Sequence, residues 1–88
     1  MWVTIVFDKW ADLDREAIVQ ACVPPLDQGT AVWHGPGKRE LSYRTQDSCA
    51  DVLEHWEDEG FNFHEFESFT YAANRPAVYD YQAEKGSN

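Results

Sequence analysis

The sequence predicts an α+β fold in which two helices pack on an antiparallel sheet of four or five strands. Stretches rich in β-branched and aromatic residues alternate with two stretches whose apolar residues recur at helical spacing. The chain has 88 residues, of which 43% are hydrophobic, a size and composition typical of one globular domain. We expect a single domain over residues 1–81 and a flexible polar tail over residues 82–88.

The first strand and the first helix occupy residues 2–23. Residues 2–7 (Trp-Val-Thr-Ile-Val-Phe) are apolar on nearly both faces, which is typical of a central strand. We expect Asp12 to cap the helix that follows, and Pro24 and Pro25 to end it, because proline lacks the amide N–H. The expected apolar set of this helix includes Leu13, Ala17, Ile18 and Ala21.

A β-hairpin is expected next. Residues 30–34 and 39–45 form its strands, and the turn chemistry of residues 35–38 (Gly-Pro-Gly-Lys) joins them. In the second strand Leu41 and Tyr43 fall on one face, whereas Ser42 falls on the other with Glu40 and Arg44. We expect His34 to face solvent beside the turn.

The second helix has clear start and stop signals. Ser48 followed by Asp51 resembles a capping box. An apolar stripe follows at i, i+3, i+4 and i+7, formed by Cys49, Val52, Leu53 and Trp56. Gly60 stands where a left-handed residue ends a helix, and Phe61 is placed to pack back on Trp56.

The aromatic stretch 61–71 is expected to be a strand with a bulge near His64 and Glu65, and residues 77–81 a short last strand. The resulting order is β-α-β-β-α-β with a possible fifth strand. This order predicts a ferredoxin-like split βαβ arrangement with both helices on one face of the sheet and the other face partly open.

Charge and composition exclude several classes of function. Sixteen acidic and seven basic residues give a net charge of −9, which argues against binding to nucleic acid or to anionic membranes. No apolar run is long enough to span a membrane, and the first residues lack the pattern of a signal peptide. Cys22 and Cys49 sit at apolar helix positions, where reduced thiols pack as small hydrophobic groups. We therefore expect a cytoplasmic protein.

Neither catalysis nor a cofactor has a recognisable motif. The chain contains no nucleophile elbow, no Gly-rich phosphate loop and no HExxH zinc motif. It has no calcium-binding loop, and His55 and His64 lack the spacing of a transition-metal site. We expect a protein that is not an enzyme and that needs no metal or cofactor.

Acidic residues are concentrated in one part of the chain. No Lys or Arg occurs from Thr45 through Asn74. Eight acids lie within this stretch: Asp47, Asp51, Glu54, Glu57, Asp58, Glu59, Glu65 and Glu67. Half of all the acidic residues therefore lie between Asp47 and Glu67, in less than a quarter of the sequence.

The acids of the second helix are placed against its stability. Asp51, Glu54 and Asp58 share the face opposite the apolar stripe, where like charges repel. Residues 57–59 (Glu-Asp-Glu) stand at the C-terminal end, where the helix dipole favours cations. A rule broken without local gain tends to mark function. The alternative is an ordinary solvated face that promotes solubility.

A functional acidic surface requires a cationic partner, and a basic protein fits best. Complementary charge steers association, and aromatic residues near the acids, such as Tyr79 and Tyr81 beside Asp80, provide apolar anchors. The candidate partner-binding residues are Asp51, Glu54, Glu57, Asp58, Glu59, Glu65, Glu67 and Asp80.

In size, acidity and α+β pattern the chain resembles the small acidic proteins that phages encode against host defence. These anti-CRISPR and anti-restriction proteins include many DNA mimics, and the resemblance is carried by the helical acids Asp51, Glu54, Glu57, Asp58 and Glu59. It implies an inhibitor that occupies the basic nucleic-acid groove of a defence nuclease or CRISPR effector in the bacterial cytoplasm. The chain is similarly like nuclease immunity proteins such as barstar. Two alternatives stay open: an immunity protein for a basic toxin nuclease, and a small dimeric ligand-binding regulatory domain.

Overall fold

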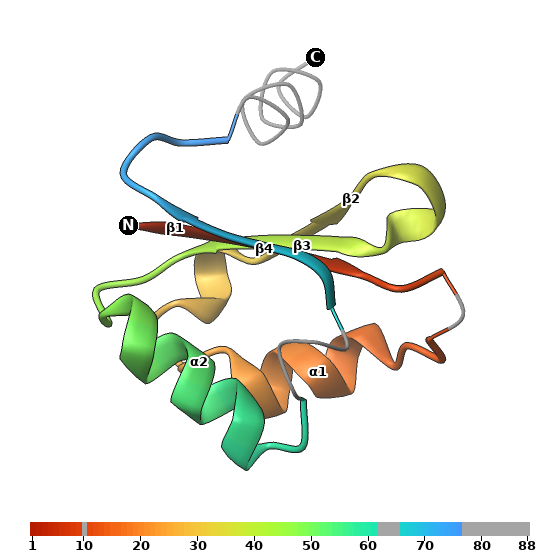
Figure 1. The fold of residues 1–88 in the computed structure, drawn as a ribbon, viewed down its shortest axis with the longest axis horizontal. Coiled ribbons are helices and arrows are strands. Elements are labelled where there is room, and N and C mark those ends of the chain that lie inside the picture. The colour runs from red at the N-terminus through yellow and green to blue at the C-terminus, as the bar shows by residue number, and fades with distance from the viewer. Residues whose placement is uncertain (10, 62–65, 77–88) are drawn as a thin grey trace.

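The protein is a two-layer α+β structure, with a four-stranded antiparallel sheet and two helices on one side of it (Figure 1). The computed structural model describes residues 1–9, 11–61 and 66–76. The strands lie in the order β2-β3-β1-β4, and every neighbouring pair is antiparallel. The predicted class, with its four-stranded antiparallel sheet and two helices, is confirmed.

Strand β1 (Trp2–Phe7) lies at the centre of the sheet, as its apolar sequence predicts. Val3, Ile5 and Phe7 point towards the helices and are buried. The register pairs Val3 with Tyr43 and Ile5 with Leu41, so that buried residues of neighbouring strands meet on the same face. This face forms the core with Ile18, Cys22, Val23, Val52, Trp56 and Phe66.

The predicted hairpin is present, formed by β2 (Val32–His34) and β3 (Glu40–Arg44). Its turn contains a 3-10 segment (Pro36–Lys38) in which Gly37 has a φ of 71°. Thr30, expected in the strand, instead ends a short 3-10 helix (Gln28–Thr30). There its side chain donates a hydrogen bond to the Asp27 carbonyl.

Helix α1 (Arg15–Cys22) begins two residues later than expected. Asp14, not Asp12, is the N-cap, and its carboxylate accepts a hydrogen bond from the Ala17 amide at 3.2 Å. Capping by Asp14 places Leu13 at N′ and Ile18 at N4, the spacing of a hydrophobic staple. The helix ends before Pro24 as predicted, with Val23 as its C-cap.

Helix α2 (Cys49–Asp58) begins and ends where the sequence predicts. Ser48 Oγ accepts a hydrogen bond from the Asp51 amide at 3.2 Å. At the other end Gly60 has a φ of 95°, and the Phe61 amide donates to the Trp56 carbonyl at 2.9 Å. The Phe61 ring contacts the Trp56 ring with centroids 5.5 Å apart. These features form a Schellman ending with its apolar contact.

Strand β4 (Phe66–Ala72) pairs with β1 and contains a bulge. A bulge lies at Glu67, because Phe7 pairs with Phe66 whereas Val6 pairs with Ser68; the expected bulge position at His64 and Glu65 is outside the described residues. The extra residue brings Phe66 onto the core face together with Phe69. Residues 62–65, the expected strand at 77–81 and the expected tail at 82–88 lie outside the described residues.

Neither helix is long and apolar enough to cross a membrane within the described part of the chain. Cys22 is buried and Cys49 is half-buried, and both are free thiols.

Candidate docking surface

The exposed face of α2 carries most of the predicted site. Five of the predicted partner-binding residues lie on this helix or its C-cap: Asp51, Glu54, Glu57, Asp58 and Glu59. All five are exposed, whereas Val52 and Trp56 on the opposite face are buried. We call these five residues the α2 acidic face. The amphipathic pattern of the helix is what turns them outwards, because burying Trp56 fixes its rotation about its axis.

No ion pair joins the α2 acidic face to a Lys or Arg among residues 1–9, 11–61 and 66–76. The side chains of two arginines donate hydrogen bonds to backbone carbonyls elsewhere. Arg15 donates to the carbonyls of Gly37 and Lys38, both at 2.8 Å. Arg39 donates to the carbonyls of Asp8 and Ala11 at 3.0 and 2.8 Å. Arg15 thus connects α1 with the hairpin turn, and Arg39 connects the end of this turn with the loop after β1.

Acidic residues also affect the ionisation of buried groups nearby. Burial raises the pKa of the Cys22 thiol to about 12, and the carboxylate of Glu59 adds to this rise. Burial likewise raises the pKa of Tyr43 to about 12, with further contributions from Asp27 and Asp47. The phenol oxygen of Tyr43 accepts a hydrogen bond from Trp56 Nε1 at 3.0 Å. Burial is thus the main reason why these two groups stay neutral, and the nearby carboxylates add to it.

Of the other three predicted partner-binding residues, the structure describes Glu67. Glu67 is exposed at the bulge of β4 and lines a cavity of about 300 Å³ with Lys9 and Arg39. Glu40 lines the same cavity. Glu65 and Asp80 lie outside the described residues.

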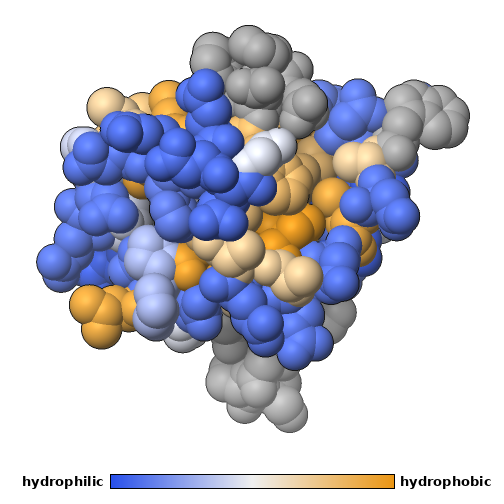
Figure 2. Space-filling model, turned by 90° about the horizontal axis from the view of Figure 1, so that it is seen from below, coloured by the Kyte–Doolittle hydropathy of each residue, from blue (hydrophilic) through white to orange (hydrophobic). Residues whose placement is uncertain are grey.

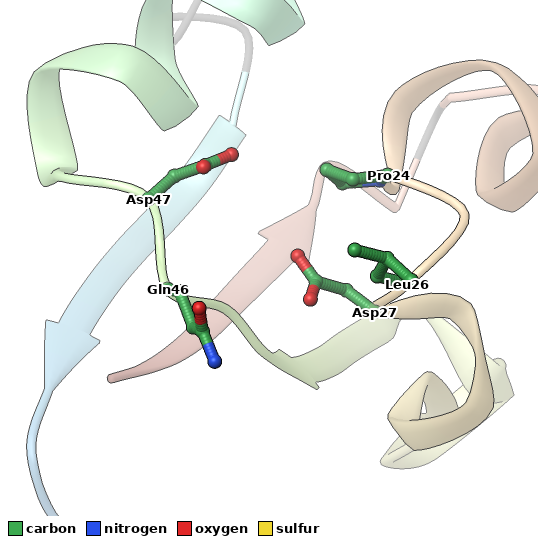
Figure 3. Close-up of a pocket in the computed structure, with 5 residues that line it drawn as sticks. All are labelled: Pro24, Leu26, Asp27, Gln46 and Asp47. Carbon is green, nitrogen blue, oxygen red and sulfur yellow. The ribbon is translucent and has the colours of Figure 1, made fainter.

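A cleft that the sequence did not predict lies before the N-terminal end of α2. It has a volume of about 370 Å³ and is lined by Pro24, Leu26, Asp27, Gln46 and Asp47 (Figure 3). Leu26 is 98% exposed on a turn closed by a hydrogen bond from the Asp27 amide to the Pro24 carbonyl at 2.8 Å. The sequence signal that could have indicated this cleft is the pair Pro24 and Pro25, because prolines make a turn rigid.

His34 is buried, so the expectation that it faces solvent was wrong. Its Nε2 lies 2.8 Å from Ser42 Oγ, and Ser42 Oγ lies 2.9 Å from Thr4 Oγ1. His34 Nδ1 lies 4.0 Å from the Glu40 carboxylate. A serine beside a histidine can form a nucleophilic site, but Ser42 is 0% exposed and no substrate can reach it. We interpret this cluster as structural.

The described residues contain no group of three or more side chains that could hold a metal ion. Comparisons with models of known protein families, with curated proteins and with solved structures found no match.

Proposed function

We propose that the protein is a non-enzymatic inhibitor that binds, through the α2 acidic face, the basic nucleic-acid groove of a defence nuclease or CRISPR effector. One observation carries this proposal. Five exposed carboxylates lie within a helix of ten residues and its C-cap, and no described cation pairs with them. An uncompensated negative surface attracts a basic groove and steers it into register.

The geometry of a helix suits the mimicry of nucleic acid without matching it atom for atom. Carboxylates one helical turn apart are separated by about 5.4 Å along the axis. Phosphates along one strand of duplex DNA follow each other about every 3.4 Å of axis rise. Side chains that bind a row of phosphates can therefore reach a row of helical carboxylates. Such an inhibitor would act in the cytoplasm of the bacterial host.

An immunity protein for a basic toxin nuclease is the second candidate, because the α2 acidic face would serve it equally well. The two functions differ in the partner. An immunity protein protects cells from one cognate toxin and leaves phage restriction unchanged.

We also propose that the fold is ferredoxin-like. The strand order supports this proposal: β3 lies between β1 and β2, which α1 connects, and β1 lies between β3 and β4, which α2 connects. Two interlocked βαβ units of this kind define the split βαβ arrangement.

A pull-down from bacterial lysate, followed by displacement with duplex DNA, tests the proposed function. We expect the wild-type protein to retain a basic nuclease that DNA or added salt releases. The variant Glu54→Gln/Asp58→Asn should bind this partner about tenfold more weakly, since it removes two charges from the α2 acidic face.

The variant Glu16→Gln/Asp27→Asn is the matched control, because it loses the same net charge at positions that do not belong to that face. Equal loss of binding in both variants would show that net charge alone acts. A partner that DNA cannot displace would contradict the mimicry.

A further inference from the structure

An apolar groove lies on the helix side of the molecule, between α1 and the residue that follows the end of α2. Its floor is formed by Ala17, Ile18 and Ala21 of α1 and by Phe61, and its volume is about 290 Å³. In the view onto this side an apolar area is bordered by hydrophilic residues (Figure 2). The groove is large enough to admit a side chain from another protein.

Ala17 and Ala21 belong to the apolar set expected in the core, yet both are exposed. Only Ile18 and Cys22 of α1 are buried. The helix therefore turns part of its apolar face to the surface, where the described residues leave it uncovered.

Two acidic residues belong to the lining of the groove. Asp12 and Asp14 line it at the start of α1. Glu59, the last residue of the α2 acidic face, is the C-cap of α2 and stands two positions before Phe61 in the chain. The α2 acidic face and the groove are therefore close together in the sequence.

We propose that this groove binds an apolar side chain carried by a basic helical segment of the partner protein. The acidic rim formed by Asp12 and Asp14 selects lysine or arginine beside that apolar residue, and the alanines leave room for it. The proposal rests on the proposed function and names the contact that anchors it. A second copy of this chain is a poor occupant, since its charge of −9 would meet the same acidic rim.

An apolar anchor supplies what the α2 acidic face lacks. Exposed ion pairs speed association but add little affinity in physiological salt. Binding energy is concentrated in desolvated apolar contacts near the centre of an interface. A helix that places leucines at i, i+3, i+4 and i+7 presents the face that a groove of this kind accepts.

The test uses synthetic helical peptides as probes and isothermal titration calorimetry in physiological salt. The first peptide carries leucines on one face and lysines on the others. The second replaces the leucines with serines and keeps every lysine. We expect the leucine peptide to bind at least about fivefold more tightly, which corresponds to about 1 kcal/mol.

The variant Ala21→Gln fills the groove without changing the charge, and we expect it to abolish the preference for the leucine peptide. Ala73→Gln makes the same substitution at an exposed position at the end of β4 and should preserve that preference. Circular dichroism of both variants confirms that they are folded. Chemical shifts of the Ala17 and Ala21 methyl groups report whether the peptide occupies the groove.

Equal affinity for the two peptides, or an unchanged preference in Ala21→Gln, would overturn the proposal. If the two peptides bind the wild type equally and Glu54→Gln/Asp58→Asn binds both of them more weakly, the role of the α2 acidic face is supported and the role of the groove is contradicted. If only Ala21→Gln loses the preference for the leucine peptide, and Glu54→Gln/Asp58→Asn binds the peptides like the wild type, the role of the groove is supported and the proposed function is contradicted. A dimer that Ala21→Gln converts to a monomer would assign the groove to self-association and also overturn the proposal.

Discussion

Three polar side chains form a hydrogen-bonded chain across three strands of the sheet. Ser42 of β3 lies between Thr4 of β1 and His34 of β2, and both Ser42 and His34 are buried. His34 Nδ1 has no hydrogen-bond partner, which leaves a buried polar atom unsatisfied. Burial lowers the pKa of His34; Glu40 opposes this shift and Lys38 adds to it. Charging this imidazole inside the fold is therefore unfavourable.

This lowered pKa predicts that acid destabilises the fold through His34. The unfolded chain takes up the proton first as the pH falls below about 6.5, so it binds more protons than the folded chain. The free energy of unfolding should then decrease towards lower pH by at most about 1.4 kcal/mol per pH unit from this residue. Urea denaturation followed by tryptophan fluorescence at several pH values measures this slope.

The variant His34→Gln removes this imidazole. His55→Gln is the control, because it makes the same substitution at a half-buried position of α2. Between pH 6.5 and the pKa of His34 in the folded protein, we expect the free energy of unfolding to depend less steeply on pH in His34→Gln only. A slope that both variants share with the wild type would assign the pH dependence to other groups.

At the residue scale the sequence predicted which strand residues face the helices, but not which polar residues are buried. Alternation along β3 separates Leu41 and Tyr43 from Ser42. It gives no information about the neighbours that Ser42 meets, because those come from β1 and β2. The hydrogen bond of His34 to Ser42 likewise joins two strands, which the local pattern around His34 does not show.

At the scale of elements, α2 shows how a helix end is determined by local sequence. Gly60 adopts a φ of 95°, and a methyl group placed there would meet no atom within 4 Å. The only cost of a side chain at this position is thus the backbone conformation itself. Phe61 then reaches back over Trp56 and closes the core at this end.

We therefore expect Gly60→Ala to destabilise the protein by about 1 kcal/mol, since left-handed backbone disfavours a Cβ atom. Gly29→Ala provides the control, because Gly29 also has open space around it and has no positive φ. It should be neutral or slightly stabilising. Thermal unfolding monitored by circular dichroism compares the two; equal melting temperatures would show that the Schellman ending contributes little.

Element boundaries were predictable where the signal was local and unique. Ser48 and Gly60 are such signals, and α2 lies between them. At the start of α1 Asp12 and Asp14 are both possible caps, and packing of Leu13 against the core favours the later one. The bulge at Glu67 depends on the register against β1, which a single strand's sequence does not contain.

At the scale of the whole molecule, charge is distributed unevenly. Arg15 and Arg39 bind carbonyls around the hairpin turn, while the α2 acidic face has no described cation beside it. The sequence predicted this face well, because helical periodicity and the lack of basic residues from 45 to 74 are both visible in one dimension. The apolar groove was not predictable, since it arises where α1 passes the end of α2 and leaves Ala17 and Ala21 uncovered.

If the α2 acidic face is kept for binding, removing part of it should make the fold more stable. Asp58 stands in the last turn of α2, where the helix dipole repels it, and Glu54 lies one turn before it. Asp58→Asn should raise the free energy of unfolding by about 0.3–1 kcal/mol at low ionic strength, and the gain should shrink as salt screens both repulsions. Chemical denaturation at two salt concentrations measures the difference.

Glu16→Gln makes the same change in net charge with the opposite expectation. Glu16 lies in the first turn of α1, where the dipole attracts an acid, so its neutralisation should lower stability slightly. Opposite signs in the two variants would show that position, not total charge, determines the effect. If both variants instead raise the free energy of unfolding by a similar amount, the acids of α2 act on stability only through net charge. The placement of Asp58 would then provide no argument for selection on binding.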